Sequence, residues 1–254
     1  MQYIYGIHAV DSLLRRNSKS VQRLWIQEGR DDKRISKLLE LARNQGVPVD
    51  HIARPALDQM VQGRHQGAVA EVVKLPVEAG EGAGSNLWEE ADLLRMVDNK
   101  DGPVLILVLD GVTDPHNLGA CLRSADAAGV DAVVVPKDKS ADLSPTVHKV
   151  ACGAAEVVPF ARVTNISRTL QALKERGVWL FGTAGEAENT IYNNDLTVSM
   201  ALIMGAEGSG MRRLTREQCD YLVRLPMAGS VSSLNVSVAT GICLFEALRQ
   251  RSAQ

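Results

Sequence analysis

Aromatic residues are scarce in this sequence, since Phe, Trp and Tyr together make up only 4% of its 254 positions. The core must therefore be aliphatic, built from Ala, Val, Leu and Ile, and the 45% hydrophobic and 23% charged shares are typical of a soluble globular protein. Runs of about 18 apolar residues are also lacking, which excludes a membrane-spanning helix. The first residues, MQYIYGIHAVDSLLRR, have no basic stretch followed by an apolar segment, so we do not expect a signal peptide. These absences predict a cytoplasmic protein.

Cysteine and histidine are too few and too scattered to predict a metal site. The five histidines are spread over the chain, and the four cysteines include no CxxC pair. Neither a zinc site nor a disulfide framework is expected, and reduced, buried thiols in a cytosolic protein fit better. The cysteines are Cys121, Cys152, Cys219 and Cys243.

The chain also lacks a strong positive charge, because its formal net charge is −2. This total hides an uneven distribution. Residues 1–74 contain 12 Lys and Arg against 8 Asp and Glu, whereas residues 75–254 contain 16 against 22. The net charge by itself argues against a nucleic-acid partner. A small basic module joined to a larger acidic one is compatible with such a partner, but an imbalance of this size also arises by chance.

The first part of the sequence alternates strand-like and helix-like segments. Residues 21–27 look like a strand, Asp31 and Asp32 can cap a helix whose apolar residues recur at helical spacing, and residues 67–75 look like a further strand. Residues 76–86, PVEAGEGAGSN, have no apolar periodicity and are typical of a flexible linker. We therefore predict a first domain, a linker with the start of the next helix, and a second domain over residues 1–75, 76–95 and 96–254.

The second part has the pattern of a parallel sheet covered by helices. Residues 103–110, PVLILVLD, form a continuous apolar run suited to a buried parallel strand, and a helix (118–129) and a strand (131–136) follow. The segments VWLFGTA, SMALIMG and YLVRLPM look like further strands, and a closing helix is expected from about Ser237 to Arg249. This alternation implies an α/β fold with a mostly parallel sheet. Ligands of such sheets bind beyond the carboxyl ends of the strands.

The first loop at a strand end is DGVTDPHNLGACLRSA, residues 110–125. It lacks the GxGxxG spacing of a dinucleotide site and offers instead Asp114, His116, Asn117 and, about two helical turns on, Arg123. These side chains suit a functional site. The alternative is structural: Asp114 and the following proline make a turn, Asn117 caps the helix, and Arg123 is solvated.

Two more loops follow strand ends. GAEGSGMRRLT (205–215) is rich in glycine but lacks the Gly-Lys-Ser/Thr ending of a phosphate-binding loop, and its Glu207 repels anions. RLPMAGSVSSLNVSVATG has no GxSxG motif and no His/Asp pairing, which argues against acyl transfer. Its small residues, with Ser233 and Asn235 near a helix start, suit a neutral or cationic ligand held largely by backbone groups.

Together and in this order, the three loops resemble the three motifs of the SpoU family of ribose 2′-O-methyltransferases, within the SPOUT superfamily. The matching segments are DGVTDPHNLGACLRSADAAGVDAVVVP, ALIMGAEGSGM and VRLPMAGSVSSLNVSVATGICLFEALRQR. In addition, YIYGIHAV and RHQGAVAEV are similar to the amino-terminal RNA-binding module of the subgroup that methylates guanosine in 23S rRNA. The resemblance covers essentially the whole chain except the linker.

The resemblance implies a catalytic SPOUT α/β domain tied in a deep trefoil knot, preceded by a small α/β module like the ribosomal L30e/L7Ae proteins. It implies S-adenosylmethionine as the cofactor, bound in the knot, and a homodimer with the active site near the subunit interface. The implied partner is 23S rRNA, free or in a large-subunit assembly particle, with no membrane and no metal. The implied reaction is methylation of the ribose 2′-OH of one guanosine, which we expect in the peptidyl-transferase P loop. A tRNA ribose 2′-O-methyltransferase and a non-catalytic RNA-binding ribosome-assembly factor are the alternatives.

The resemblance also assigns roles to residues at the motif positions. The four catalytic positions are Asn117, Arg123, Glu207 and Asn235. Family proposals make the arginine a general base, but a guanidinium with a pKa above ~12 more easily holds a phosphate and stabilises negative charge on oxygen. Cofactor contacts are expected from Thr183, Gly205, Leu225, Met227, Ser233 and Leu234, with ordinary core packing as the alternative for the two leucines. In the amino-terminal module, RNA contacts are expected from Arg64, His65, Gln66 and Gly67, and phosphate contacts from Arg15 and Arg16, with solvated surface arginines as the alternative.

Overall fold

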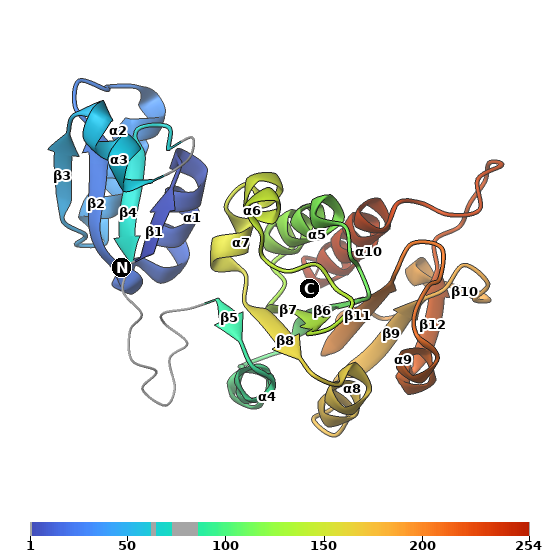
Figure 1. Cartoon of the computed structure of the whole chain (residues 1–254). Helices are drawn as coiled ribbons and strands as arrows, with labels where there is room; N and C mark the ends of the chain where they lie inside the picture. Colours follow the sequence, from blue (N-terminus) through green and yellow to red (C-terminus); the bar gives the residue numbers. More distant parts are fainter. Residues whose placement is uncertain (1, 62–64, 73–85, 254) are drawn as a thin grey trace. The chain divides into compact units, whose positions relative to one another are not determined.

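The computed structural model describes residues 2–61, 65–72 and 86–253 of the chain. The chain divides into two compact units, one formed by residues 1–86 with 152–157 and the other by residues 87–151 with 158–254 (Figure 1). The domain boundary predicted at residue 75 and most of the predicted linker lie outside the described residues, so they stay predictions.

The first unit contains a four-stranded sheet with the order β1–β4–β2–β3. β4 pairs antiparallel with β1 and β2, and β3 runs parallel to β2. The predicted strand over residues 21–27 is confirmed as β2. In chain order the elements are β1 (Gln2–Tyr5), α1 (Ile7–Asn17), η1 (Ser18–Ser20), β2 (Val21–Gln27), α2 (Lys33–Asn44), β3 (Val49–Ile52), α3 (Arg54–Met60) and β4 (Ala68–Val72).

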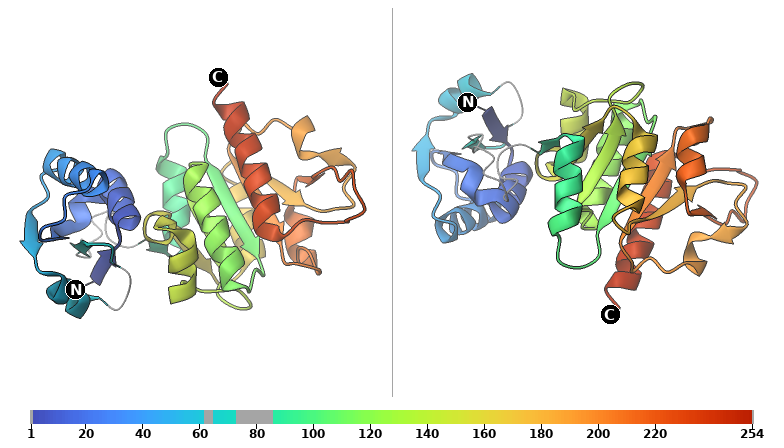
Figure 2. Two further views of the ribbon diagram at one scale, coloured as in Figure 1. Left: turned by 90° about the horizontal axis from the view of Figure 1, so that it is seen from above. Right: turned by 90° about the horizontal axis from the view of Figure 1, so that it is seen from below.

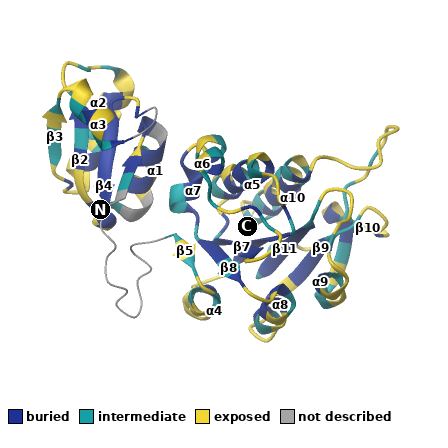
Figure 3. Ribbon diagram, viewed as in Figure 1, coloured by how far each residue is buried: buried dark blue, intermediate teal, exposed yellow. Residues whose placement is uncertain are grey.

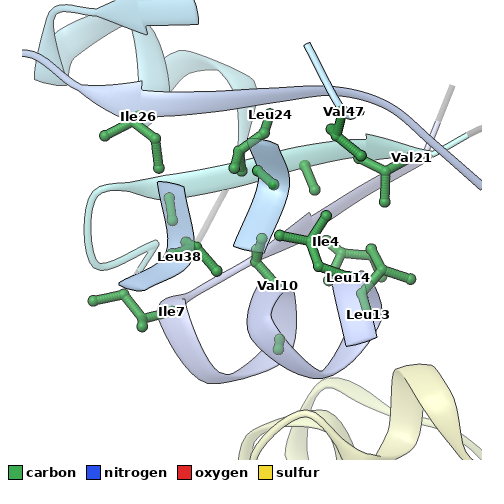
Figure 4. Packing of buried hydrophobic residues seen from close by; sticks show 14 of the residues in the cluster. Ile4, Ile7, Val10, Leu13, Leu14, Val21, Leu24, Ile26, Leu38 and Val47 are labelled. Carbon is green, nitrogen blue, oxygen red and sulfur yellow. The ribbon is translucent and has the colours of Figure 1, made fainter. Parts of the chain in front are cut away.

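Helix α2 shows how the sequence builds the core of this unit. The Asp32 carboxylate accepts hydrogen bonds from the backbone N–H groups of Arg34 and Ile35, at 3.0 and 3.2 Å, and thereby caps the helix. The apolar residues Ile35, Leu38 and Ala42 then recur at helical spacing and lie buried on one face. They belong to the aliphatic cluster that α1, β1 and β2 also supply (Figure 4).

The second unit contains an eight-stranded sheet with the order β10–β12–β9–β11–β6–β7–β8–β5, in which neighbouring strands run parallel. Its elements are β5 (Leu87–Trp88), α4 (Glu90–Asn99), β6 (Leu105–Asp110), α5 (Pro115–Ala127), β7 (Ala132–Pro136), α6 (Pro145–Ala151), β8 (Phe160–Val163), α8 (Ile166–Lys174), β9 (Trp179–Thr183), β10 (Asn189–Thr190), η2 (Ile191–Asn193), β11 (Met200–Gly205), α9 (Arg213–Gln218), β12 (Tyr221–Arg224) and α10 (Val236–Arg251). The short helix α7 (Ala154–Val157) follows α6 in the chain and belongs to the first unit.

The position of β6 explains its unbroken apolar sequence. All six of its residues are buried, because β11 and β7 flank it and helices cover both faces of the sheet (Figure 3). Figures 1 and 2 show α5, α6 and α10 on one face and α4, α8 and α9 on the other. The predicted α/β fold with a mostly parallel sheet is therefore confirmed.

Two local expectations are wrong, and one strand was not predicted. The helix expected from residue 118 begins at Pro115 and is capped by Asp114, so the alternative in which Asn117 is the cap is wrong. Strand β8, Phe160–Val163, was not predicted. Cys152 is exposed, so the expectation of uniformly buried thiols is also wrong.

The other three cysteines lie in less accessible surroundings. Burial raises the pKa of Cys121 and of Cys219 to about 11 and that of Cys243 to about 12. No helix in the described part of the chain is long and apolar enough to cross a membrane. Within residues 2–61, 65–72 and 86–253, no three His, Cys, Asp or Glu side chains are grouped to hold a metal ion.

Candidate active site

The sheet order brings the three loops singled out in the sequence to one edge. β12, β9, β11 and β6 are consecutive and parallel, so their carboxyl ends lie side by side. The loops that follow these four strands therefore start from the same edge of the sheet, where ligands of parallel sheets bind. The last residues of the strands are Arg224, Thr183, Gly205 and Asp110.

Three predicted residues, Asn117, Glu207 and Asn235, meet in one hydrogen-bonded cluster above this edge. Glu207 Oε1 accepts hydrogen bonds from Asn117 Nδ2 at 3.2 Å and from Asn235 Nδ2 at 2.6 Å. Asn235 Nδ2 also donates to Asn117 Oδ1 at 2.9 Å. The cluster joins segments separated by 90 and 118 positions in the sequence, and it is the point at which all three loops are tied together.

Helix caps place two members of this cluster. Asp114 accepts a hydrogen bond from the His116 backbone N–H at 2.9 Å, and this contact is the largest cause that holds the pKa of Asp114 below its usual value. The cap starts α5, and Asn117 in its first turn is only 8% exposed. Asn235 caps α10, because its Oδ1 accepts from the Ser237 N–H at 3.0 Å. Each asparagine amide is therefore held by a helix start.

The third member, Glu207, lies at the tip of a tight turn after β11. The backbones of Ala206 and Gly210 exchange two hydrogen bonds of 2.9 and 3.0 Å, which close the turn. A Cβ atom at Gly205 would lie 2.2 Å from backbone atoms of Gly210 and Met211, so only glycine fits at this position. The turn fixes where the Glu207 carboxylate is presented.

A buried aspartate that sequence reasoning missed anchors the same turn. Asp110, the last residue of β6, is 1% exposed and accepts a hydrogen bond from the Arg212 backbone N–H at 2.8 Å. Its other carboxylate oxygen lies 3.3 Å from Arg212 Nε. The available signal was a single acidic residue at the end of a fully apolar strand, because such a carboxylate must find a partner when it is buried.

Arg123 lies on a different side of α5 from Asn117. Six residues separate the two, which in an α-helix corresponds to about 9 Å along the axis and about a third of a turn around it. Arg123 is exposed, whereas Asn117 faces the protein interior. The structure therefore brings together three of the four predicted catalytic residues and places the arginine on the adjoining surface of the same helix.

The predicted cofactor-binding residues fall into two groups. Thr183 and Gly205 end neighbouring strands, and the Thr183 hydroxyl donates to the Ile203 carbonyl at 3.1 Å. The remaining four belong to the segment between β12 and α10, which extends away from the sheet (Figure 1). Leu225 and Met227 are partly buried, and Ser233 and Leu234 are exposed. The alternative of ordinary core packing therefore does not describe Leu234.

The predicted RNA-binding residues are all in the first unit, and the structure describes most of them. Arg15 is exposed and forms an ion pair with Asp11 at 2.8 Å. His65 is buried, with its Nε2 2.9 Å from Asp58 Oδ1. Gln66 is exposed and Gly67 is buried. Arg64 and the side chain of Arg16 lie outside the described residues.

The geometry of the cluster indicates what it can bind. The Glu207 carboxylate, held by two amide groups, places a negative charge beside the carboxyl ends of the strands. This charge attracts a cationic ligand and repels an anionic one. Partly buried apolar side chains of the segment after β12 can pack against a flat ring. A ligand with a positive charge and an aromatic base fits these features best.

Two families match the chain, and between them they cover both units. Residues 104–245 match the SpoU rRNA Methylase family. Residues 3–77 match a family described as RNA 2′-O ribose methyltransferase substrate binding. The first match contains the whole Asn117–Glu207–Asn235 cluster.

Similar proteins span the full length of the chain. A 23S rRNA (guanosine-2′-O-)-methyltransferase RlmB of Pseudomonas syringae is 60% identical, with 100% of this chain and 98% of that protein covered. A protein of the same name from Escherichia coli is 56% identical, with 99% of each covered. Among solved structures, the SpoU methyltransferase AviRb of Streptomyces viridochromogenes in complex with AdoMet is 25% identical with a TM-score of 0.69, covering 99% of this chain and 91% of that one.

Proposed function

This chain belongs to the SpoU rRNA methylase family, and we propose that it methylates the ribose 2′-hydroxyl of a guanosine in 23S rRNA with S-adenosylmethionine as the methyl donor. The observation that carries this proposal is the cluster of Asn117, Glu207 and Asn235, which ties the three family motifs together at the strand ends. The relatives named for this reaction are similar over both units of the chain.

The residues at the strand ends fit S-adenosylmethionine. The Glu207 carboxylate suits the positive charge of a sulfonium. Gly205 and the turn after it let a ligand approach the backbone closely, and Leu225, Met227 and Leu234 keep accessible apolar surface for an adenine ring. When bound, the cofactor supplies a methyl group that is already activated. The chain itself then has to position the ribose and to assist the loss of the proton from its 2′-hydroxyl.

Positioning is the larger of these two tasks. Fixing two reactants in the productive geometry can supply about 7–11 kcal/mol in favourable cases. We assign Asn117, Glu207 and Asn235 to holding the three loops in that geometry. Arg123 is assigned to the phosphate next to the ribose and to the negative charge that develops on the 2′-oxygen, because a guanidinium keeps its proton in nearly all protein settings.

We also propose that two copies of the chain form a homodimer through α10. The outer face of this helix carries Val238, Ile242 and Phe245, which are 50%, 36% and 49% exposed and recur at helical spacing. The segment before the helix adds Val231 and Leu234, also exposed. Several exposed apolar residues on one helix face are typical of subunit contacts. Because α10 packs on α5, a second copy bound there would lie near Arg123 and the cluster.

The finer predictions rest on the resemblance. They are the domain division at residues 75 and 95, the knotted path of the chain from residue 96 onward, and a target guanosine in the peptidyl-transferase P loop. The substrate-binding match over residues 3–77 supports RNA recognition by the first unit. The names of the similar proteins favour 23S rRNA over tRNA and an active enzyme over a non-catalytic assembly factor.

The test is methyl transfer from labelled S-adenosylmethionine to unmodified 23S rRNA, with the modified position mapped. We expect one 2′-O-methylguanosine with the wild type and at least a hundredfold lower rate with Arg123→Ala, on the scale of losing one oxyanion-stabilising donor. Arg95→Ala is the control, because Arg95 is an exposed arginine that pairs with Asp92 on α4. Methylation of tRNA alone, or undiminished activity of Arg123→Ala, would contradict the proposal.

A further inference from the structure

The first unit has a polar pocket that none of the catalytic residues reach. It has a volume of about 340 Å³, within the range of small-ligand sites. Arg30 from the loop after β2, Arg34 from α2 and Arg54 from α3 line it together with the turn before β4. Three arginines from three different segments therefore line one pocket.

The wall of this pocket is held by His65, whose two ring nitrogens are both engaged within the chain. Its Nδ1 accepts a hydrogen bond from the Gly67 N–H at 3.0 Å. Nδ1 therefore carries no proton, and Nε2–H donates to Asp58 Oδ1 at 2.9 Å. The imidazole is neutral in this arrangement and 4% exposed. His65 therefore links α3 to the turn through its two hydrogen bonds. It offers a ligand neither a charge nor a ring nitrogen that is still available for hydrogen bonding.

The turn itself is shaped to receive Arg30. Gln66 and Gly67 both have left-handed backbone angles, with φ of 50° and 74°. The Gln66 carbonyl accepts a hydrogen bond from Arg30 Nη1, and Arg30 Nε donates to Asp32 at 2.7 Å. A Cβ atom at Gly67 would lie 2.8 Å from Arg30 Nη1, so glycine leaves room for the guanidinium. Arg30 is thus fixed in place by the chain.

The other two arginines remain available to a ligand. Arg54 is 70% exposed, and its contact with Asp58 is long, at 3.9 Å. Arg34 is exposed, and among the described residues its guanidinium is in no hydrogen bond or ion pair. With a neutral His65, the described residues that line the pocket carry the positive charges of three arginines and the negative charge of Asp58. Because Asp32 offsets Arg30, one net positive charge remains. This excess attracts an anion, and guanidinium groups match the oxygens of a phosphate geometrically.

We propose that this pocket binds one nucleotide of the RNA substrate, with its phosphodiester group held by Arg34 and Arg54. The inference rests on the proposed function, because the rRNA is what brings a phosphodiester to this unit. A pocket of about 340 Å³ is larger than a phosphate needs. The Gln66 Oε1 accepts a hydrogen bond from the Ile7 N–H at 3.3 Å, which leaves the amide Nε2 on the pocket wall to meet a base edge. Phosphate contacts of this kind set the position of the RNA, while the chemistry takes place in the second unit.

The test is RNA binding by the full-length double variant Arg34→Gln/Arg54→Gln, measured by fluorescence anisotropy on unmodified 23S rRNA over a range of KCl concentrations. Glutamine has nearly the same helix propensity as arginine and stays polar, but it is shorter and carries no charge. Arg43→Gln is the matched control, because Arg43 is exposed in the last turn of the same helix α2 and does not line the pocket. Affinity for S-adenosylmethionine, measured by calorimetry, reports whether the second unit is intact.

We expect the Kd for RNA to rise at least about tenfold in the double variant. The slope of log K against log [KCl] should become less steep by about 0.7–0.9, as expected when one phosphate is no longer neutralised. S-adenosylmethionine affinity stays at the wild-type level in the double variant, and Arg43→Gln behaves as wild type in both measurements.

The outcomes separate the two proposals. If the wild type methylates 23S rRNA and the double variant binds it with unchanged Kd and salt slope, the pocket assignment is overturned and the proposed function stands. If RNA affinity depends on Arg34 and Arg54 but the wild type transfers no methyl group, the pocket assignment stands and the proposed function is overturned.

Discussion

Replacing Asn235 by aspartate removes the hydrogen-bond donors of the strand-end cluster and leaves the helix cap in place. In the wild type, Asn235 Nδ2 lies 2.6 Å from Glu207 Oε1 and 2.9 Å from Asn117 Oδ1, while Asn235 Oδ1 accepts from the Ser237 N–H at 3.0 Å. Aspartate caps a helix about as well as asparagine does, so the start of α10 is preserved. The oxygen that replaces Nδ2, however, belongs to a second carboxylate beside Glu207. It also faces Asn117 Oδ1, so that two hydrogen-bond acceptors meet where a donor and an acceptor met before.

The size of the effect follows from these distances. Two carboxylates about 4 Å apart repel by about 1 kcal/mol in water and by about 4 kcal/mol at the effective dielectric constant near a protein surface. Glu207 and Asn235 are exposed, so we expect a cost of about 2 kcal/mol, between these limits. This corresponds to a fall in Tm of about 4–8 °C for a chain of this size. If S-adenosylmethionine needs the intact cluster, its affinity falls about 30-fold.

The assays are thermal unfolding followed by circular dichroism, and calorimetric titration with S-adenosylmethionine. Asn235→Ser is the matched control, because serine also caps a helix but adds no charge. We expect its Tm and its affinity to lie between those of the wild type and those of Asn235→Asp. Wild-type affinity for S-adenosylmethionine together with an unchanged Tm in Asn235→Asp would refute the reasoning, since the cluster would then hold neither the loops nor the cofactor site.

Three further predictions concern other parts of the second unit and the thiols. We expect Phe245→Glu to convert a dimer to a monomer in analytical ultracentrifugation and to lower methyl transfer. Leu214→Glu, at a similarly exposed leucine on α9, should leave the dimer intact, and a monomeric wild type would contradict this prediction. We expect Gly205→Ala to lower the free energy of unfolding by about 1–3 kcal/mol, because the added Cβ meets backbone atoms. Gly185→Ala should not lower it, because the space around Gly185 is open, and equal Tm values for the two variants would contradict this prediction. At about pH 8 we expect DTNB to react rapidly only with Cys152, because the raised pKa of the other three thiols keeps them protonated. All four of the chain's cysteines should react after unfolding. More than one rapidly reacting thiol in the folded protein would contradict the burial of the other three.

Much of the fold could be predicted from local signals in the sequence. β6 was predictable because a fully buried parallel strand needs an unbroken apolar run. α2 was predictable because Asp32 and the spacing of Ile35 and Leu38 mark its start and its buried face. β8 escaped prediction because its four residues, FARV, form a short run that includes an arginine, and their burial depends on neighbours that the sequence does not name.

The site was predictable in its residues but not in its contacts. That Asn117, Glu207 and Asn235 belong together followed from the strand-end rule and from the family resemblance, whereas their hydrogen bonds depend on the order of strands in the sheet. The anchor between Asp110 and Arg212 depends on the same order. The arginine pocket of the first unit brings together segments that no single periodicity connects, so only the structure could place it.

The central claim is that the segments around Asn117, Glu207 and Asn235 form one site that presents a methyl sulfonium to a ribose hydroxyl. A crystal structure of the full chain with S-adenosylmethionine tests it most directly. We predict density for the cofactor at the carboxyl ends of β9, β11 and β12, with its sulfonium facing the cluster. Density for the cofactor at any other surface of the chain would contradict the claim.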